Sequence, residues 1–372
     1  MALKSTDEPL SLTYRLALLD LDGVVYRGKN PVPRAAENIR TAEAFGMTIE
    51  YTTNNSSRMQ ATVADQLRGF DLDVEPHQVI TSSVVAARMV AKACTPGAKV
   101  LVLGAEHLRD EVGKQGLVVV DGLEDPVALA GDDDPATASG IEAAIQGWYP
   151  EMTWNQMAQV AYAVEAGARY YVTNRDLTIP RELGIAPGCG SMIQAVVNAT
   201  GVEPVSSAGK PESAMYDEAR ELAAAPGEDL VSVAQSLAIG DRLDTDIEAG
   251  NRGGYDSLCV LTGVTSPAML MTAPPKLRPT YISLDLDGLN DPAPAVARDA
   301  GSGSLDSGMD GVSWTCRDAR ATFVAADRAV VVSDAHSVDG LRAACALCWE
   351  LADAGLDVAA LTLPEFILEP ND

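Results

Sequence analysis

Basic side chains are scarce in this sequence. Only 27 lysines and arginines stand against 53 aspartates and glutamates, and the formal net charge is −26. Binding to nucleic acid needs clustered Lys and Arg that displace counterions, and anionic membranes attract the same residues. The composition therefore argues against both partners, and we interpret the acidic residues as a solvated surface. Adaptation to high salt stays open.

Cysteines are few and scattered. They stand at positions 94, 189, 259, 316, 345 and 348 of the 372 residues, which does not suit the disulfide framework of a small secreted protein. Cys345 and Cys348 have CxxC spacing, but both fall on the apolar face of a predicted helix at 338–354. We interpret them as buried thiols rather than a metal or redox pair.

Long apolar runs are also missing, since none approaches the roughly 20 residues of a membrane span. The first residues, MALKSTDEPLSLTY, lack the basic start and apolar centre of a signal peptide. We therefore expect a cytoplasmic protein. Apolar residues make up 47% of the chain, enough for a sizeable core and for two or three domains at this length.

Apolar, β-rich segments alternate with helical patterns, which predicts an α/β fold with a parallel sheet covered by helices on both faces. Strands are expected at 14–20, 47–53, 98–104, 117–120, 169–173, 236–240, 255–261 and 279–285. Helices are expected at 33–46, 57–70, 83–94, 105–115, 154–166, 190–199, 211–224 and 245–250. Loops are expected at 131–140 and 273–279.

Two short stretches read Asp-Leu-Asp-Gly, at residues 20–23 and 285–288. The first ends a predicted buried strand, where side chains two apart point to the same side. Asp20 and Asp22 would project into the crevice where open α/β sheets bind ligands. One carboxylate can act as a nucleophile and the other as a general acid and then base. A calcium loop is excluded because its third acidic ligand and final Glu are missing, while a plain turn remains the alternative.

Two further candidate positions follow predicted strands or open predicted helices. Strand 47–53 ends at Thr53, and Asn54 and Asn55 follow it. A hydroxyl beside the free N–H groups of a helix start forms a cradle for phosphate oxygens, and a helix cap is the alternative. Lys210 opens another predicted helix, where it would supply a cation to an anionic transition state or else be an ordinary surface lysine.

Carboxylates gather after the strand at 236–240. Asp241 follows it directly, and Asp244 and Asp246 begin a short predicted helix. Carboxylates that converge on one point suit Mg²⁺, which prefers hard oxygen ligands. Helix capping is the alternative for Asp244 and Asp246, and we prefer it for Asp244.

The four motifs are DxDG, T-N-N, G-K-P and G-D-x-x-x-T-D, in this order along the chain. With them the chain resembles the haloacid dehalogenase superfamily of phosphohydrolases, and more narrowly its NagD-like branch of small-molecule phosphatases. The resemblance covers residues 14–288. It implies a Rossmann-like core and Mg²⁺-dependent hydrolysis of a small phosphomonoester through an aspartyl phosphate.

The resemblance also implies roles for individual residues. Asp20 would attack phosphorus, and Asp22 would protonate the leaving alcohol and then activate water. Thr53 and Lys210 would hold the phosphoryl oxygens, with Asn54 nearby. Asn55 and Arg58, which lie close to Asn54 in the sequence, are further candidates for binding the substrate phosphate. Arg58 is either a clamp on the phosphate side or an exposed helix residue.

The same resemblance implies the metal ligands. Mg²⁺ would bind Asp20, the backbone carbonyl of Asp22, and Asp241. Asp246 would lie in or beside this ligand shell.

In this branch a cap domain is inserted between the second and third motifs, here at residues 82–205, so the core would comprise 1–81 and 206–289. Two stretches of the insertion resemble the substrate-facing loops of the branch, and their candidate residues are Asn174, Arg175, Asp176, Gly188 and Gly190. The family usually has Pro at position 175, so Arg175 either contacts the leaving group or faces solvent. Asp176 is either a substrate contact or a polar loop residue.

Residues 290–311 are rich in Pro, Gly, Ser, Ala and Asp and predict a linker. A small α+β appendage should follow at 312–372, with strands at 312–316, 320–325, 329–333 and 357–362 around the helix at 338–354. It resembles the acetyltransferase-like extension of actinobacterial glycerol-3-phosphate phosphatases. The Gly-rich acetyl-CoA loop is missing, so we expect a structural or dimer-forming module without acetyl transfer. A homodimer through the cap or this module, and a simple core-covering appendage, both stay open.

Glycerol 3-phosphate is the expected substrate on this resemblance. Phosphoglycolate, pyridoxal phosphate and a nucleotide monophosphate remain open, as do a phosphotransferase and a non-catalytic regulatory protein. The presence of Asp20, Asp22, Lys210 and Asp241 argues against a non-catalytic protein. The second Asp-Leu-Asp-Gly, at 285–288, comes after every other motif, and we interpret it as a strand end and turn.

Overall fold

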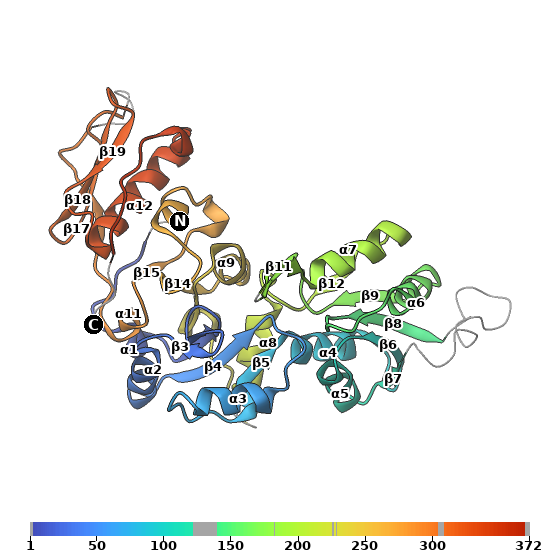
Figure 1. Cartoon of the computed structure of the whole chain (residues 1–372). Coiled ribbons are helices and arrows are strands. Elements are labelled where there is room, and N and C mark those ends of the chain that lie inside the picture. The colour runs from blue at the N-terminus through green and yellow to red at the C-terminus, as the bar shows by residue number, and fades with distance from the viewer. Residues whose placement is uncertain are drawn as a thin grey trace. The chain divides into compact units, whose positions relative to one another are not determined.

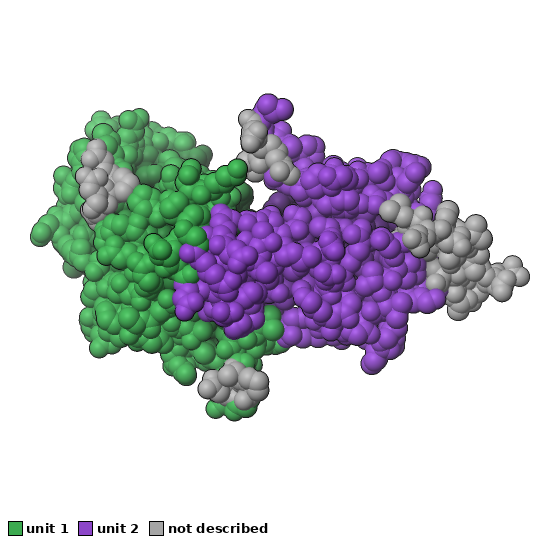
Figure 2. All heavy atoms as spheres, turned by 60° about the horizontal axis from the view of Figure 1, so that its bottom comes forward, with its two compact units in different colours: residues 1–51, 69–72, 220–372 green, residues 52–68, 73–219 purple. Residues whose placement is uncertain are grey.

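The structure, a computed structural model, describes residues 3–121, 140–181, 183–224, 227, 229–303 and 309–368. The chain divides into two compact units (Figure 2). Unit 1 comprises residues 1–51, 69–72 and 220–372, and unit 2 comprises residues 52–68 and 73–219. Most of the loop predicted at 131–140 lies outside the described residues, as does part of the predicted linker.

The largest sheet has six strands in the order β15-β14-β13-β1-β4-β5. Their bounds are β1 Leu16–Asp20, β4 Thr48–Thr53, β5 Val79–Thr81, β13 Ser236–Gly240, β14 Asp256–Val260 and β15 Tyr281–Ser283. β1 pairs with β13, β13 with β14, and β14 with β15, all in parallel. The predicted parallel α/β sheet is confirmed, and its buried apolar strands agree with a sheet covered on both faces.

Helices connect most of these strands, as the alternating pattern predicted, although the short helices at 10–13, 267–271 and 287–290 were not expected. Their bounds are α1 Leu10–Thr13, α2 Ala35–Ala44, α3 Gln60–Arg68, α4 Ser82–Ala93, α8 Ala214–Leu222, α9 Glu248–Gly253, α10 Pro267–Met271 and α11 Asp287–Asn290. A short hairpin, β2 Tyr26–Arg27 with β3 Asn30–Pro31, follows β1. A π-helical turn at Leu243–Ile247 precedes α9, where the sequence predicted an ordinary helix at 245–250.

A second sheet, in unit 2, has the order β12-β9-β8-β6-β7 and is parallel throughout. Its strands are β6 Lys99–Leu103, β7 Val118–Val120, β8 Ile141–Gln146, β9 Arg169–Val172 and β12 Ser206–Ser207. Helices α6 Trp154–Glu165 and α7 Cys189–Thr200 share an apolar core with it. Figure 1 shows α4 and α5 Glu106–Lys114 on the other face. This sheet is the separate cap sheet implied by the insertion.

Two elements of unit 2 were missed in the sequence. The central strand β8 reads IEAAIQ, and its alanines and glutamate gave no strand signal. The antiparallel hairpin of β10 Thr178–Arg181 and β11 Gly184–Pro187 was also missed. Both β10 and β11 contain a proline, which lowers the strand signal.

The C-terminal part forms a four-stranded antiparallel sheet, β16-β17-β18-β19, with one long helix against it (Figure 1). The bounds are β16 Val296–Arg298, β17 Ser313–Cys316, β18 Ala319–Val324, β19 Ala329–Val332 and α12 Val338–Asp353. β16 lies in the segment predicted as a linker and pairs with β17. The strand predicted at 357–362 is wrong: a 3-10 helix occupies Val358–Ala360, and only Thr362 bridges to β19.

This C-terminal module shares its apolar core with the large sheet. Residues of α12 cluster with Leu270, Met271 and Ile282 of the core. Trp349 donates a hydrogen bond to the Leu270 carbonyl at 2.8 Å, and the buried Arg278 pairs with Asp353 at 2.7 Å. Cys345 and Cys348 are free and buried in this cluster, as expected. Among the described residues, no helix is both long and apolar enough to cross a bilayer.

Glu50 is a carboxyl side chain buried within β4. It is 3% exposed, its Oε2 has no hydrogen-bond partner among the described residues, and burial raises its pKa to about 8. The unfolded chain releases this proton near pH 4.5, so only the folded protein retains it between about 4.5 and 8. Unfolding free energy should therefore fall as pH rises through this window. We expect Glu50→Gln to melt above the wild type at pH 8 and close to it at pH 5. An equal difference in melting temperature at both values would contradict this assignment.

Candidate active site

Asp20 ends β1, and the chain turns sharply beyond it. Leu21 is fully buried, whereas Asp22 is exposed. Gly23 has a φ of +91° and donates a hydrogen bond to the Tyr26 carbonyl at 2.7 Å. A side chain at position 23 would be strained by that φ. The Asp-Leu-Asp-Gly sequence thus forms the expected turn at a strand end.

Asp241 follows β13, the parallel neighbour of β1. It is 1% exposed, and its Oδ2 accepts a hydrogen bond from Val264 N–H at 2.6 Å. A Cβ on Gly23 would come within 2.5–2.9 Å of the Asp241 carboxylate, and one on Gly263 would overlap it. Two glycines therefore make the space that this carboxylate occupies.

Asp246 lies on the π-helical turn at Leu243–Ile247. It is 1% exposed, and its Oδ2 accepts from Arg242 N–H at 3.1 Å. A Cβ on Gly240 would overlap its side chain. Asp244, by contrast, is exposed and pairs with Arg242 at 2.9 Å. The helix-capping role that we preferred for Asp244 is not seen, since Arg242 is the cap residue of this turn and no side-chain cap bond is present there among the described residues.

Asp20, Asp241 and Asp246 form a compact carboxylate cluster in unit 1. One oxygen of each lies within 4.8 Å of the others, and two of the three residues are buried. Three negative charges so close together and shielded from water repel one another unless a cation neutralises them. An all-oxygen donor set suits Mg²⁺ or Ca²⁺. The cluster therefore fits a divalent cation.

Unit 2 holds the predicted phosphate-binding residues. Thr53 ends β4, and its Oγ1 accepts from Asn55 N–H at 3.2 Å. Asn55 Oδ1 accepts from the N–H groups of Ser57 and Arg58 at 2.9 and 3.0 Å. Arg58 donates to Gln66 on the following helix at 2.7 Å. The Asn55 side chain thus shapes its own turn, and Arg58, which precedes α3, is bonded to that helix.

Lys210 is also in unit 2 and is 2% exposed. Its backbone N–H donates to Asn54 Oδ1 at 2.8 Å, and its carbonyl accepts from Asn54 Nδ2 at 2.9 Å. The structure therefore brings together Asn54 and Lys210, which are 156 positions apart in the sequence. An ordinary surface lysine, the alternative that the sequence left open, does not fit this burial.

Asn174, Arg175 and Asp176 follow β9. Asn174 donates to the backbone carbonyl of Asn54 at 2.9 Å, and Asp176 accepts from Asn54 Nδ2 at 3.2 Å. Arg175 points elsewhere in the unit, with contacts of 3.3 Å to the Glu203 carboxylate and the Pro204 carbonyl. These contacts hold the loop of Arg175 against the segment at 203–204.

Gly188 and Gly190 lie at the start of α7. Gly188 N–H donates to the Leu177 carbonyl at 2.8 Å, and Gly190 N–H to the Asp176 carbonyl at 2.9 Å. A Cβ on either glycine would overlap the backbone of Arg175 or Asp176. Both glycines therefore allow the helix start to pack directly on this loop.

The loop after β14 was not recognised in the sequence. Val264 N–H contacts Asp241, and Thr262 Oγ1 donates to the Gly23 carbonyl at 2.6 Å. One signal was the sequence T-G-V-T at 262–265, which places a glycine directly after a predicted strand end. This loop follows a strand end on the same sheet edge as Asp20 and Asp241, and it braces both of their loops.

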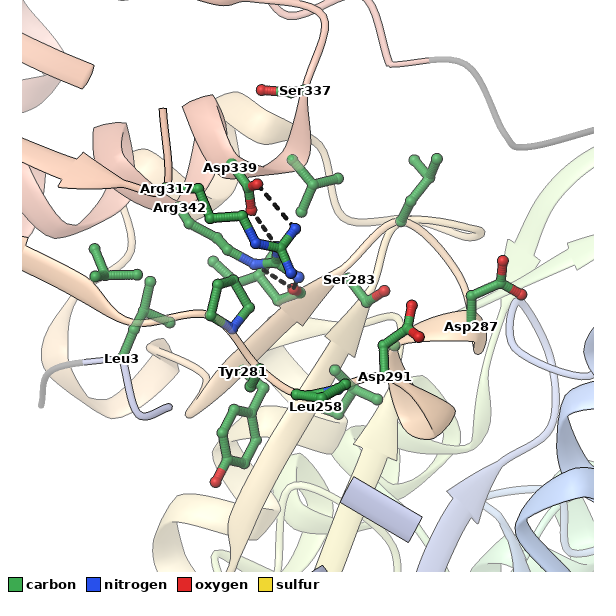
Figure 3. A pocket seen from close by; sticks show the side chains of 18 of the residues that line it. Leu3, Leu258, Tyr281, Ser283, Asp287, Asp291, Arg317, Ser337, Asp339 and Arg342 are labelled. Carbon is green, nitrogen blue, oxygen red and sulfur yellow. Dashed lines mark hydrogen bonds and ion pairs between the residues drawn. The ribbon is translucent and has the colours of Figure 1, made fainter. Parts of the chain in front are cut away.

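A cavity of about 310 Å³ within unit 1 lies away from these carboxylates. It is lined by the second Asp-Leu-Asp-Gly stretch and by residues before and within α12 (Figure 3). Asp285 follows β15 and accepts from Asp287 N–H at 2.8 Å, so the stretch begins with the expected turn and then enters the short helix α11. Figure 3 shows Arg317 and Arg342 directed at Asp339. None of Asp20, Asp241 and Asp246 lines this cavity.

Two family models match the chain. Residues 17–118 match the haloacid dehalogenase-like hydrolase model, and residues 207–289 match a second model described as HAD-hydrolase-like. The chain is 36% identical over 296 residues to D-glycerol 3-phosphate phosphatase of Mycobacterium tuberculosis, covering 77% of this chain and 76% of that protein. It is also 36% identical over 253 residues to 5'-nucleotidase YutF of Bacillus subtilis, covering 68% and 89%.

Solved structures show the same similarity. The magnesium complex of glycerol phosphate phosphatase from M. tuberculosis superposes with a TM-score of 0.72 at 32% identity, covering 92% of both chains. Its calcium complex superposes with a TM-score of 0.74 at 32% identity, covering 96% of this chain and 94% of that one. The p-nitrophenyl phosphatase of Archaeoglobus fulgidus has a TM-score of 0.64 at 29% identity and covers 74% of this chain and 98% of its own.

Proposed function

Because this chain belongs to the haloacid dehalogenase-like hydrolases, as a phosphoric monoester hydrolase of the NagD and p-nitrophenylphosphatase type, we propose that it hydrolyses glycerol 3-phosphate with Mg²⁺ as cofactor. The choice of substrate depends on how much of this chain each similar structure covers. The similarity to glycerol phosphate phosphatase extends over 96% of this chain, while that to p-nitrophenyl phosphatase covers 74%. The C-terminal module thus belongs to the shared architecture.

In the proposed mechanism, Asp20 attacks phosphorus while Asp22 protonates the leaving alkoxide. The product alcohol departs and an aspartyl phosphate remains on Asp20. Asp22, now a carboxylate, takes a proton from water, which attacks phosphorus and releases phosphate. The Asp20 carboxylate is restored, so atoms and protons balance over the cycle.

The other proposed residues stabilise charge. Thr53 and Lys210 hold the phosphoryl oxygens, on which negative charge is spread in the transition state. Asp20, the backbone carbonyl of Asp22, Asp241 and Asp246 would hold Mg²⁺. When bound, Mg²⁺ neutralises the charge of the carboxylates and the phosphoryl group. The clustering of the three carboxylates supports this assignment.

We expect Asp241→Asn to raise the Mg²⁺ concentration needed for half-maximal turnover by about 10- to 100-fold, because one anionic ligand is lost. Titration of Mg²⁺ into metal-free enzyme, with phosphate release as readout, measures this shift. Asp244→Asn is the matched control, since Asp244 is exposed and pairs with Arg242. Equal Mg²⁺ requirements in the Asp241 variant and the wild type would contradict the ligand assignment.

A screen of phosphate release over small phosphomonoesters tests the substrate. We expect kcat/KM to be highest for glycerol 3-phosphate, compared with phosphoglycolate, pyridoxal phosphate and nucleoside monophosphates. A nucleotidase is the second candidate, because YutF is 36% identical, as is the glycerol 3-phosphate phosphatase. A higher kcat/KM for a nucleoside monophosphate would overturn the first choice. Donor consumption without free phosphate would indicate a phosphotransferase.

A further inference from the structure

The side-chain amide of Asn54 holds both backbone groups of Lys210. Oδ1 accepts from the Lys210 N–H at 2.8 Å, and Nδ2 donates to the Lys210 carbonyl at 2.9 Å. Two opposed hydrogen bonds to one residue fix both its distance and its orientation, as in the pairing of two antiparallel strands. Asn54 thereby fixes the backbone from which the Lys210 side chain extends.

The remaining amide hydrogen of Asn54 is directed at Asp176. Nδ2 lies 3.2 and 3.3 Å from the two oxygens of that carboxylate. A side-chain amide carries two donor hydrogens, so Lys210 and Asp176 together use both. No hydrogen is left on the Asn54 side chain for a phosphate oxygen. This count argues against the direct phosphate contact that its position in the sequence suggested.

Asp176 also decides which way the amide of Asn54 points. A side-chain amide can flip and exchange its donor with its acceptor. An ionised carboxylate only accepts hydrogen bonds, so it selects the orientation that presents Nδ2 to it. The same orientation is the one that pairs with Lys210.

The surroundings hold Asn54 in place. Its backbone carbonyl accepts from Asn174 Nδ2 at 2.9 Å and from Ser82 Oγ at 2.7 Å. A Cβ on Gly209 would come within 2.7 Å of Asn174 Cβ and 2.8 Å of Asn54 Oδ1. The close approach of these loops therefore requires glycine before Lys210.

We infer that Asn54 is a positioning residue for Lys210, and that Asp176 locks Asn54 in the orientation this task requires. The inference rests on the proposed function, in which Lys210 neutralises charge on the transferring phosphoryl group. A displaced Lys210 would stabilise the transition state less well, because such stabilisation depends on preorganised geometry. The loop that carries Asp176 would then take part in catalysis without touching the reacting atoms.

Asn54→Asp is the sharpest single test because it preserves the size of the side chain. Its new oxygen faces the Lys210 carbonyl and the Asp176 carboxylate, so two attractive contacts become repulsive, while the bond from Lys210 N–H survives. We expect kcat to fall about 100-fold, the effect of a displaced catalytic group. KM should change by less than about threefold, since the lost interaction belongs to the transition state.

A second substitution tests the part played by Asp176. In the double variant with Asp176→Asn, an amide at position 176 can donate to the carboxylate introduced at position 54. We expect this exchange of donor and acceptor to restore kcat about tenfold over Asn54→Asp alone, a typical coupling between contacting residues. Asn155→Asp, an exposed position on α6, is the matched control and should leave kcat unchanged.

The test compares the wild type with four variants: Asn54→Asp, Asp176→Asn, the double variant and Asn155→Asp. Steady-state kinetics and melting temperatures are measured for all five proteins. If the wild type hydrolyses phosphomonoesters and Asn54→Asp has the same kcat, the positioning role of Asn54 is overturned. A double variant no faster than Asn54→Asp would overturn the role of Asp176. Absence of Mg²⁺-dependent turnover in the wild type would instead contradict the proposed function. Melting temperatures of the same variants measure the coupling between positions 54 and 176 even if the protein has no activity.

Discussion

Asp20→Asn is expected to lower kcat by at least about 10⁴-fold, because an amide cannot replace a carboxylate nucleophile. Asp285→Asn, in an identical Asp-Leu-Asp-Gly stretch, should leave kcat within about twofold, as expected away from the reacting atoms. Asp20 ends a central strand and shares a cluster with Asp241 and Asp246. Asp285 follows the edge strand β15 and bonds to the backbone of Asp287.

The pair of variants separates chemistry from folding. Both change one carboxylate to an amide of the same size, and both affect a turn after a strand. Phosphate release at saturating substrate and Mg²⁺ measures kcat, and circular dichroism confirms that each variant is folded. Similar losses in the two variants would show that the sequence motif alone does not mark the nucleophile. Full activity of Asp20→Asn would exclude Asp20 from the reaction.

Lys210→Met should lower kcat by about 10³-fold, since removal of one group that stabilises transition-state charge commonly has an effect near this size. Methionine keeps the long apolar stem that a residue 2% exposed needs, while it removes the cation. KM should rise as well, because the ammonium also attracts the phosphate of the bound substrate. Steady-state phosphate release over a range of substrate concentrations measures both parameters.

The control for this variant is Lys99→Met, at an exposed position on β6. Unchanged kinetics there would show that loss of one positive charge from a strongly acidic protein has no general effect. If Lys210→Met retained wild-type kcat, the positive charge at position 210 would have no catalytic role. The inference about Asn54 would then fail with it.

The sequence predicted most of the fold because buried parallel strands leave a clear apolar pattern. β1, β4, β13 and β14 all lie where their apolar runs indicated, and the ends of β1, β4 and β13 carry three of the four motifs. β8 was missed because a central strand that contains alanine and glutamate resembles a helix. The strand expected at 357–362 failed for the opposite reason: an apolar segment can be buried without pairing in a sheet.

Residue types, together with the family resemblance, were enough to select the three carboxylates that cluster. The sequence could not show which side chains form hydrogen bonds to other residues of the site rather than to the substrate. Asn54 was assigned to phosphate, yet its amide bonds to Lys210 and Asp176, which are 156 and 122 positions away. Arg175 was left between two roles, and only its contacts with Glu203 and Pro204 show what it binds. Such pairings depend on the folded chain, because no local pattern in the sequence encodes them.

The central claim is that a covalent aspartyl phosphate forms on Asp20, and peptide mapping tests it most directly. Asp22→Asn should slow hydrolysis of the intermediate, because the base that activates water is lost. This variant is mixed with p-nitrophenyl phosphate carrying a radioactive phosphate, because nitrophenolate departs without the proton that Asp22 supplies. The mixture is quenched in acid and digested with pepsin at acid pH, where an acyl phosphate survives. We predict label in the peptide that contains position 20, and none there when Asp20 is also changed to Asn. Label in any other peptide, or turnover of the wild type with no trapped label at all, would contradict the account.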